Sequence, residues 1–144
     1  MPTPRPDVDD RTWTAPDYRP RPVTHLVLLR YRDDLGPEER AEVERRFRAL
    51  AHSRRDGREY IRSIRAGAQI SPEAGAGDFD VAFVIEFASE GDRNYYLGRP
   101  FVTEPDCIDA AHDDFKEFVG PMLAPGGALI FDFVDESAEG GDAT

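Results

Sequence analysis

Four stretches of the chain have the residue pattern of β-strands. The first, VTHLVLLRY at 23–31, is apolar at both alternating sets of positions, which is typical of a strand buried on both sides. EYIRSIRAGAQI at 59–70 and FDVAFVIEF at 79–87 follow, with the turn-rich SPEAGAGD between them. GGALIFDFV at 126–134 is the fourth stretch. The pattern therefore predicts four strands.

Helices are predicted between these strands. Pro37 suits the first position of a helix whose apolar residues are spaced i, i+4, i+7 and i+8: Val43, Phe47, Leu50 and Ala51. A short helix opens at Ser89, which resembles a capping box with Asp92 and is followed by the helix-ending residues Gly98 and Pro100. A further helix begins near Asp109, with an apolar stripe of Phe115, Phe118, Val119 and Met122.

The resulting order, β-α-β-β-α-β, predicts an α+β fold of the ferredoxin-like class, in which an antiparallel four-stranded sheet has its helices on one side. The other side of such a sheet is left bare. We expect that bare face to consist of Val27, Leu29, Tyr31, Phe79, Val81, Phe83 and Ile85. Because a large exposed apolar face needs a cover, a second copy of the chain is predicted to form a homodimer with it.

The chain is predicted to have three parts. Residues 1–21 contain Pro2, Pro4, Pro6, Pro16 and Pro20, so this segment is predicted to be an extended arm without a helix or a central strand. Trp13 and Tyr18 are unusual in a solvated arm and are expected to pack on the domain or its partner. Residues 22–134 form the domain, and the acidic, Gly-rich residues 135–144 are predicted to be a disordered tail.

Composition excludes several classes of function. The chain has 29 acidic and 18 basic residues, a net charge of −11, so nucleic acid is not an expected partner. A single cysteine, Cys107, excludes an intrachain disulfide, and the three histidines lack metal-ligand spacing. No segment approaches the roughly 18 apolar residues of a membrane span, and the start does not resemble a signal peptide. We therefore expect a cytoplasmic protein that binds neither a membrane nor a metal.

Five motifs, in this order and spacing, resemble the stress-responsive dimeric A/B barrel (Dabb) family: THLVLLRY, GAQISPE, FDVAFVIEF, AAHDDFKEFV and LIFDF. The resemblance covers roughly residues 22–134. It implies that two ferredoxin-like subunits close their sheets into a dimeric barrel whose lumen holds a ligand. The chain is also similar to the polyketide cyclases of the olivetolic acid cyclase type, which perform an intramolecular aldol condensation without a cofactor.

The resemblance to the cyclases implies three catalytic residues. His112 would be the general base and Tyr96, with Tyr95 as the adjacent candidate, would donate a hydrogen bond to the substrate carbonyl. His25 takes the place of a lumen histidine, with an orienting role. The implied ligand is a small apolar carbonyl compound of the polyketide type, contacted by Val27, Leu29, Tyr31, Val81, Phe83, Ile85, Tyr95 and Arg99.

Each of these residues also has a purely structural interpretation. His112 and His25 are equally typical of buried histidines that are hydrogen-bonded to a neighbour. Tyr96 could be a core residue with its hydroxyl at the surface, and Arg99 a solvated loop residue.

Two classes of function remain open. One is a small cofactor-free enzyme, a cyclase or a related acid–base catalyst; the other is a non-catalytic stress-associated or small-ligand-binding barrel. An open barrel lumen with His112 and Tyr96 facing inward would indicate the enzyme. A lumen filled by Phe79, Phe83 and Tyr31 would indicate the binding protein.

Overall fold

A four-stranded antiparallel sheet forms the centre of the computed structural model, which describes residues 2–73, 75 and 77–137. The strand order across the sheet is β4-β5-β1-β6, so consecutive strands of the chain are not all neighbours. This is the ferredoxin-like arrangement that the sequence predicts. The strands are β1 (Val23–Tyr31), β4 (Ile61–Ala68), β5 (Val81–Phe87) and β6 (Leu123–Phe133).

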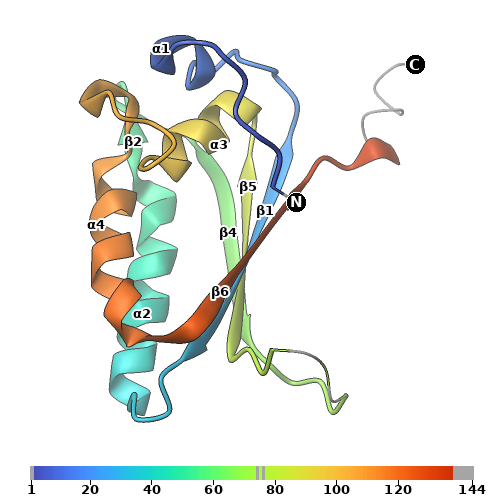
Figure 1. Cartoon of the computed structure of the whole chain (residues 1–144), viewed down its shortest axis with the longest axis vertical. Helices are drawn as coiled ribbons and strands as arrows, with labels where there is room; N and C mark the ends of the chain where they lie inside the picture. The colour runs from blue at the N-terminus through green and yellow to red at the C-terminus, as the bar shows by residue number, and fades with distance from the viewer. Residues whose placement is uncertain (1, 74, 76, 138–144) are drawn as a thin grey trace.

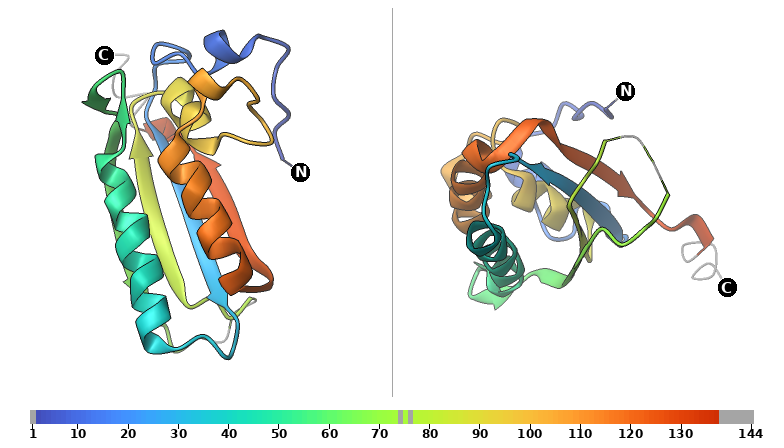
Figure 2. Two further views of the ribbon diagram at one scale, coloured as in Figure 1. Left: turned by 90° about the vertical axis from the view of Figure 1, so that its left-hand side faces the viewer. Right: turned by 90° about the horizontal axis from the view of Figure 1, so that it is seen from below.

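Two helices, α2 (Pro37–Ala49) and α4 (Ala110–Val119), lie side by side over one face of this sheet (Figures 1 and 2). Pro37 occupies the first helical position of α2, as predicted. At the start of α4, the carboxylate of Asp109 accepts hydrogen bonds from the backbone N–H groups of Ala111 and His112 at 3.0 and 3.4 Å. These caps fix where both helices begin.

Shorter elements cluster at one end of the sheet. Helix α3 (Glu90–Leu97) begins at Ser89, whose hydroxyl accepts from the N–H of Asp92 at 3.0 Å, so the predicted cap is confirmed. A small hairpin, not predicted from the sequence, joins β2 (Arg54–Arg55) to β3 (Arg58–Glu59). Its two turn residues both have positive φ, as in the tightest hairpin turns. Single turns of 3-10 helix are η1 (Leu50–His52) and η2 (Pro105–Cys107). A third, η3 (Gly120–Met122), lies at the opposite end of the sheet, where the carbonyl of Met122 accepts a hydrogen bond from the N–H of Arg32.

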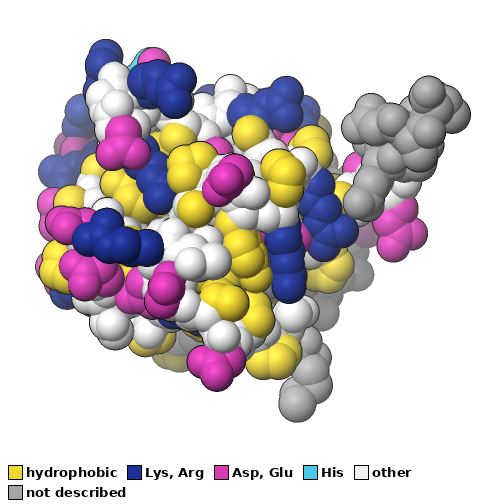
Figure 3. Space-filling model, turned by 90° about the horizontal axis from the view of Figure 1, so that it is seen from above, with side chains coloured by type: hydrophobic (Ala, Val, Ile, Leu, Met, Phe, Trp, Pro, Cys, Tyr) yellow, Lys and Arg dark blue, Asp and Glu magenta, His cyan; other side chains and the backbone are white. Residues whose placement is uncertain are grey.

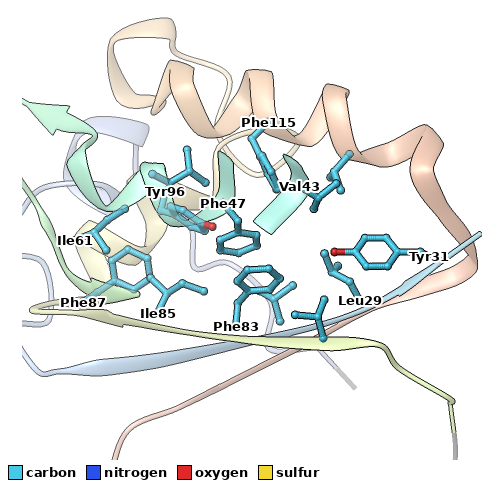
Figure 4. Close-up of a cluster of buried hydrophobic side chains, with 14 of the residues drawn as sticks. Leu29, Tyr31, Val43, Phe47, Ile61, Phe83, Ile85, Phe87, Tyr96 and Phe115 are labelled. Carbon is cyan, nitrogen blue, oxygen red and sulfur yellow. The ribbon is translucent and has the colours of Figure 1, made fainter. Parts of the chain in front are cut away.

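The core lies between the sheet and helices α2 and α4, and it is filled by aromatic side chains (Figure 4). Phe47 of α2 stacks on Phe83 of β5 with ring centroids 3.8 Å apart and planes within 8°. Phe115 of α4 meets Phe47 edge-on at 5.1 Å. Phe83 is 0% and Tyr31 4% exposed, and both lie in this core between the sheet and the chain's own helices.

The prediction of which residues form the bare face of the sheet is wrong. Its members in the two central strands are buried beneath the chain's own helices and belong to the main core: Val27, Leu29, Tyr31, Val81, Phe83 and Ile85. Both alternating sets of β1 are apolar, so the strand pattern itself does not distinguish the two faces. The helices settle the question, because the stack of Phe47 on Phe83 requires the aromatic face of β5 to point toward α2.

The uncovered face is formed by the alternate set of residues. Leu26 is paired with Val84 on β5 and with Phe131 on β6, and paired residues of neighbouring strands share a face. On β6, Leu129 is 42% and Phe131 58% exposed. The expectation that a second copy covers an apolar sheet face therefore stands, but it applies to this set of residues.

The N-terminal segment packs on the domain and includes one short helix. The prediction that it contains no helix is wrong for α1 (Asp10–Trp13), a single turn that lies in a stretch without proline. Trp13 is buried against Val102, Cys107 and Ile108, which confirms that it packs on the domain. Its carbonyl accepts a hydrogen bond from the side-chain amide of Asn94 at 2.8 Å.

Deleting residues 1–20 is expected to lower the melting temperature by at least about 5 °C. The deletion removes Trp13 from a buried cluster, and loss of such a side chain typically costs about 3–5 kcal/mol. Thermal unfolding followed by circular dichroism measures the change. Trp13 is the single tryptophan, so its fluorescence in the full chain reports whether the arm is docked. A truncated protein that melts at the temperature of the full chain would show that the arm contributes nothing.

Candidate functional site

The three residues predicted to be catalytic lie together around the ring of Tyr96. The imidazole of His112 stacks on this ring, with centroids 3.6 Å apart and planes within 14°. The ring of His25 meets it edge-on at 5.5 Å. The three residues come from β1, α3 and α4, so the fold brings together positions far apart in the sequence. We call this group the histidine–tyrosine cluster: His25, Tyr96 and His112.

A hydrogen bond to the backbone of α3 orients the ring of His112. Its Nδ1 hydrogen-bonds to the backbone carbonyl oxygen of Tyr96, and because a carbonyl only accepts, Nδ1 carries the proton. Nε2 is then the basic nitrogen. Burial lowers the pKa of His112 to about 3, with smaller contributions from the charges of Lys116 and His25, while the bond to the carbonyl opposes the shift. His112 is therefore neutral at ordinary pH.

His25 has a carboxylate partner. Its Nδ1 lies 2.6 Å from Oδ1 of Asp132, which is opposite it on the neighbouring strand β6. The other oxygen of Asp132 accepts from the guanidinium of Arg93 at 2.7 Å. Burial alone would raise the pKa of Asp132, but the hydrogen bonds from His25 and Arg93 hold it below its ordinary value. A histidine oriented by a carboxylate is the arrangement of a general base.

The hydroxyl of Tyr96 is buried and has no hydrogen-bond partner among the described residues. The side chain is 1% exposed, so the alternative of a hydroxyl at the surface does not apply. Burial and the nearby charges of Asp109 and Asp132 raise its pKa, so the hydroxyl keeps its proton. An unmade hydrogen bond of a buried group costs about 1–3 kcal/mol. With no acceptor among the described residues, the hydroxyl is available as a hydrogen-bond donor.

The buried carboxylate of Asp109 helps to hold the helices that carry Tyr96 and His112. Asp109, the cap of α4, accepts hydrogen bonds from the hydroxyls of Ser53 and Tyr60. Its backbone N–H donates to the carbonyl of Tyr95 at 3.3 Å. Because α3 and α4 are tied together at this point, the spacing between Tyr96 and His112 is fixed by more than their own contact.

The remaining predicted ligand contacts do not form one surface. Six of them lie in the filled core: Val27, Leu29, Tyr31, Val81, Phe83 and Ile85. Tyr95 is buried but points toward Tyr60, whose ring it meets edge-on at 5.0 Å. The side chain of Arg99 is 59% exposed and lies 3.9 Å from Asp113, as in its structural interpretation. Whether any of them contacts a ligand stays a prediction.

Sequence reasoning missed Asp132 and Arg93. Asp132 is the acidic residue of LIFDF. A charged residue in the middle of an apolar strand is unusual, and this could have indicated a functional role. Its meaning depends on the register of β6 against β1, which pairs it with His25. Arg93 looks like an ordinary charged residue on a short helix.

Neither a metal site nor a membrane helix is found in the part of the chain that the structure describes. Within residues 2–73, 75 and 77–137, no group of three or more His, Cys, Asp or Glu side chains is arranged to hold a metal ion. Among the same residues, no helix is long and apolar enough to cross a bilayer.

The low pKa of His112 predicts acid sensitivity. The unfolded chain takes up a proton at this residue below a pH of about 6.5, whereas the folded protein does so only near pH 3. Protonation of His112 therefore does not affect the free energy of unfolding above pH 6.5, and it lowers that free energy as the pH falls from 6.5 toward 3. Between pH 7 and 4.5 the His112→Asn variant should lose about 2–3 kcal/mol less free energy of unfolding than the wild type.

Urea denaturation at the two pH values measures this difference. His52→Asn is the matched control, because the His52 side chain is 81% exposed. Equal losses in the wild type and the His112→Asn variant would contradict the assigned burial of a neutral histidine.

Comparison with known proteins gives a family and a fold. The family model of the stress responsive A/B barrel domain (Dabb) matches residues 23–135. A search of curated protein sequences finds no match. Among solved structures, the hydroxynitrile lyase from Passiflora edulis is similar with a TM-score of 0.61 and 17% identity, over 80% of this chain and 94% of that chain.

Two further structures show the same fold. A protein from Arabidopsis thaliana has a TM-score of 0.60 and 21% identity, over 77% of this chain and 92% of its own. A ferredoxin-like protein of unknown function from Jannaschia sp. CCS1, described as dimeric, has a TM-score of 0.58 and 17% identity, over 78% of this chain and 97% of its own. At these identities the similarity establishes the fold alone.

Proposed function

We propose a function for this chain from the premise that it belongs to the stress-responsive A/B barrel domain (Dabb) family. The chain is a cofactor-independent acid–base enzyme that makes or breaks a carbon–carbon bond next to a carbonyl group. Its substrate is a small apolar carbonyl compound of the polyketide type. The reaction takes place at the histidine–tyrosine cluster, and the working form is a homodimer.

One observation supports this proposal above the others: the unpartnered hydroxyl of Tyr96 lies beside a histidine that is paired with a carboxylate. Aldol-type chemistry needs a base for the C–H or O–H proton and a donor for the carbonyl oxygen on which negative charge develops. His25 with Asp132 offers the first, and Tyr96 offers the second.

We divide the roles differently from the prediction made from the sequence. His112 is a weak base, because its pKa of about 3 lies far below the pH at which it would have to hold a proton. His25 is better suited, since Asp132 orients it and would stabilise the imidazolium once it forms. His112 then keeps the ring of Tyr96 in place by stacking on it.

Two reactions fit this division of roles. An intramolecular aldol condensation of a poly-β-keto chain begins with proton removal next to a carbonyl. The similar structure from Passiflora edulis is a hydroxynitrile lyase, whose name denotes cleavage of a hydroxynitrile. In that reaction the base removes the hydroxyl proton, the bond to the nitrile carbon breaks as the carbonyl forms, and the departing cyanide takes up the proton from the base. Both require the same base and the same oxygen-directed donor.

Tyr96→Phe tests the proposal. With poly-β-keto compounds and hydroxynitriles as substrates, the variant should form product on the order of 10- to 100-fold more slowly, because one hydrogen-bond donor to the developing charge is lost. Product formation is followed by chromatography. Tyr18→Phe is the matched control, since Tyr18 lies in the N-terminal arm. An undiminished rate in Tyr96→Phe would contradict the donor role.

A second function is favoured by the packing of the core. Tyr96 is 1% exposed and belongs to the same filled core as Phe83 and Phe47, so a substrate reaches it only if side chains move apart. The alternative is a non-catalytic dimeric barrel that binds a small ligand or takes part in a stress response. Ligand binding without turnover of either substrate class would favour this alternative.

A further inference from the structure

A continuous series of hydrogen bonds joins the N-terminal arm to the candidate base. It begins at the backbone carbonyl oxygen of Trp13, which accepts from Nδ2 of Asn94 at 2.8 Å. Oδ1 of Asn94 accepts from Nε of Arg93 at 2.9 Å, and Nη1 of Arg93 donates to Oδ2 of Asp132 at 2.7 Å. Oδ1 of Asp132 lies 2.6 Å from Nδ1 of His25. The arm is thereby connected with the histidine–tyrosine cluster.

Each group in this series fits in one orientation. The side chain of Asn94 is 0% exposed, and only one orientation of its amide gives the NH2 group to the carbonyl of Trp13 and the oxygen to Arg93. A carboxylate only accepts, so Nδ1 of His25 carries the proton of its bond to Asp132. Because the bonds follow one another, a change at one residue leaves the next one without a fixed partner.

The arm is seated on the first turn of α3. The backbone N–H of Glu90 donates to the carbonyl of Arg19 at 3.1 Å. The N–H of Gly91 donates to the carbonyl of Tyr18 at 3.0 Å. Gly91 also leaves room for the arm, because a Cβ at this position would overlap the carbonyl oxygen of Ala15. Helix α1 accordingly lies next to α3 (Figures 1 and 2).

The exposed ion pairs of the arm contribute little to its docking. Seen from above, the end of the molecule that carries the arm shows Lys and Arg side chains close to Asp and Glu side chains (Figure 3). In one such pair, Arg11 lies 3.4 Å from Asp106 and the two side chains are 72% and 73% exposed. Pairs of this kind are weak because water and salt screen them. The buried contacts of Trp13 and the close approach at Gly91 therefore matter more.

We propose that Asn94 and Arg93 are positioning residues that couple the docked arm to His25. The proposal rests on the function proposed above, in which His25 is the base. With the arm in place, Asn94 holds Arg93 and the guanidinium holds the carboxylate of Asp132. The carboxylate in turn keeps the proton of His25 on Nδ1, which leaves Nε2 as the basic nitrogen. Displacement of the arm removes the acceptor of Asn94 and loosens this arrangement.

Gly91→Ala in the full chain tests the coupling, because it displaces the arm and changes no residue of the hydrogen-bonded series. The emission of Trp13, the single tryptophan, reports docking and should shift to longer wavelength. ¹H NMR reports the Nδ1 proton of His25, which a carboxylate partner shifts downfield and which is assigned by its absence in His25→Gln. This signal should be lost or move upfield. Gly120→Ala is the matched control, since a Cβ there meets no atom within 4 Å, and it should change neither reading.

Asn94→Leu tests the connection itself, because leucine has a similar branched shape but neither donates nor accepts a hydrogen bond. It should cause the same loss of the His25 signal. Adding Gly91→Ala to it should change the signal no further, since both substitutions break one series. In both single variants, turnover of poly-β-keto compounds or hydroxynitriles should fall about tenfold, because a misplaced base reacts more slowly.

The NMR signal separates this coupling from the proposed reaction. An unshifted emission in Gly91→Ala, or a shifted emission with an unchanged His25 signal, would overturn the coupling. An unchanged signal in a folded Asn94→Leu variant would do the same. If the signal is lost in both variants while the wild type turns over neither substrate class, the coupling is supported and the proposed reaction fails.

Discussion

The His25→Ala variant is expected to turn over substrate on the order of 100-fold or more slowly than the wild type. His25 is the residue of the cluster with a carboxylate partner, and removal of a general base typically costs this much. His112→Ala should cost less than His25→Ala, because a ring with a pKa of about 3 takes part by packing on Tyr96. The measurement is the rate of product formation with saturating substrate, after circular dichroism confirms folding.

Asp132→Asn separates catalysis from packing at the same place. The amide keeps the size of the carboxylate but no longer stabilises an imidazolium, so the rate should fall and its dependence on pH should change. A purely structural role of Asp132 would leave the pH profile unchanged. If His112→Ala instead loses most of the activity while His25→Ala keeps it, the base is His112, as the cyclase resemblance implies.

The order of the elements could be predicted from the sequence because it rests on local signals. Ser89 and Asp109 both begin helices, and Pro37 occupies the first position of α2, since capping and proline geometry involve only neighbouring residues. The small hairpin was missed because a strand of two residues has no pattern to detect. Helix α1 was missed because prolines on either side hide a four-residue stretch that contains none.

The two faces of the sheet and the pairing of His25 could not be predicted, because both depend on contacts between distant segments. Apolar residues on both sides of β1 are compatible with either orientation of the helices. Likewise, a histidine on one strand and an aspartate on another meet only for one register of β1 against β6. The three catalytic candidates came from a family resemblance, and the structure adds their partners.

Phe131→Asp is expected to convert a dimer into a monomer. Phe131 is 58% exposed on the uncovered sheet face, opposite Leu26, and a second copy that covers this face would bury it. A stable interface of this kind buries about 800 Å² per partner, and an unpaired charge within it should raise the dissociation constant at least about 100-fold. Light scattering at micromolar concentration measures the mass.

The neighbouring residue provides a matched control for the face. Ile130 is 54% exposed, almost as much as Phe131, but it alternates with it and so lies on the helix side of β6. Ile130→Asp introduces the same charge one residue away and should leave the dimer intact. Dissociation in both variants would mean that the charge acts regardless of the face. A wild type that is a folded monomer at micromolar concentration would exclude the dimeric barrel, because the apolar residues Leu26, Leu28, Leu129 and Phe131 would then be stable in water without a cover.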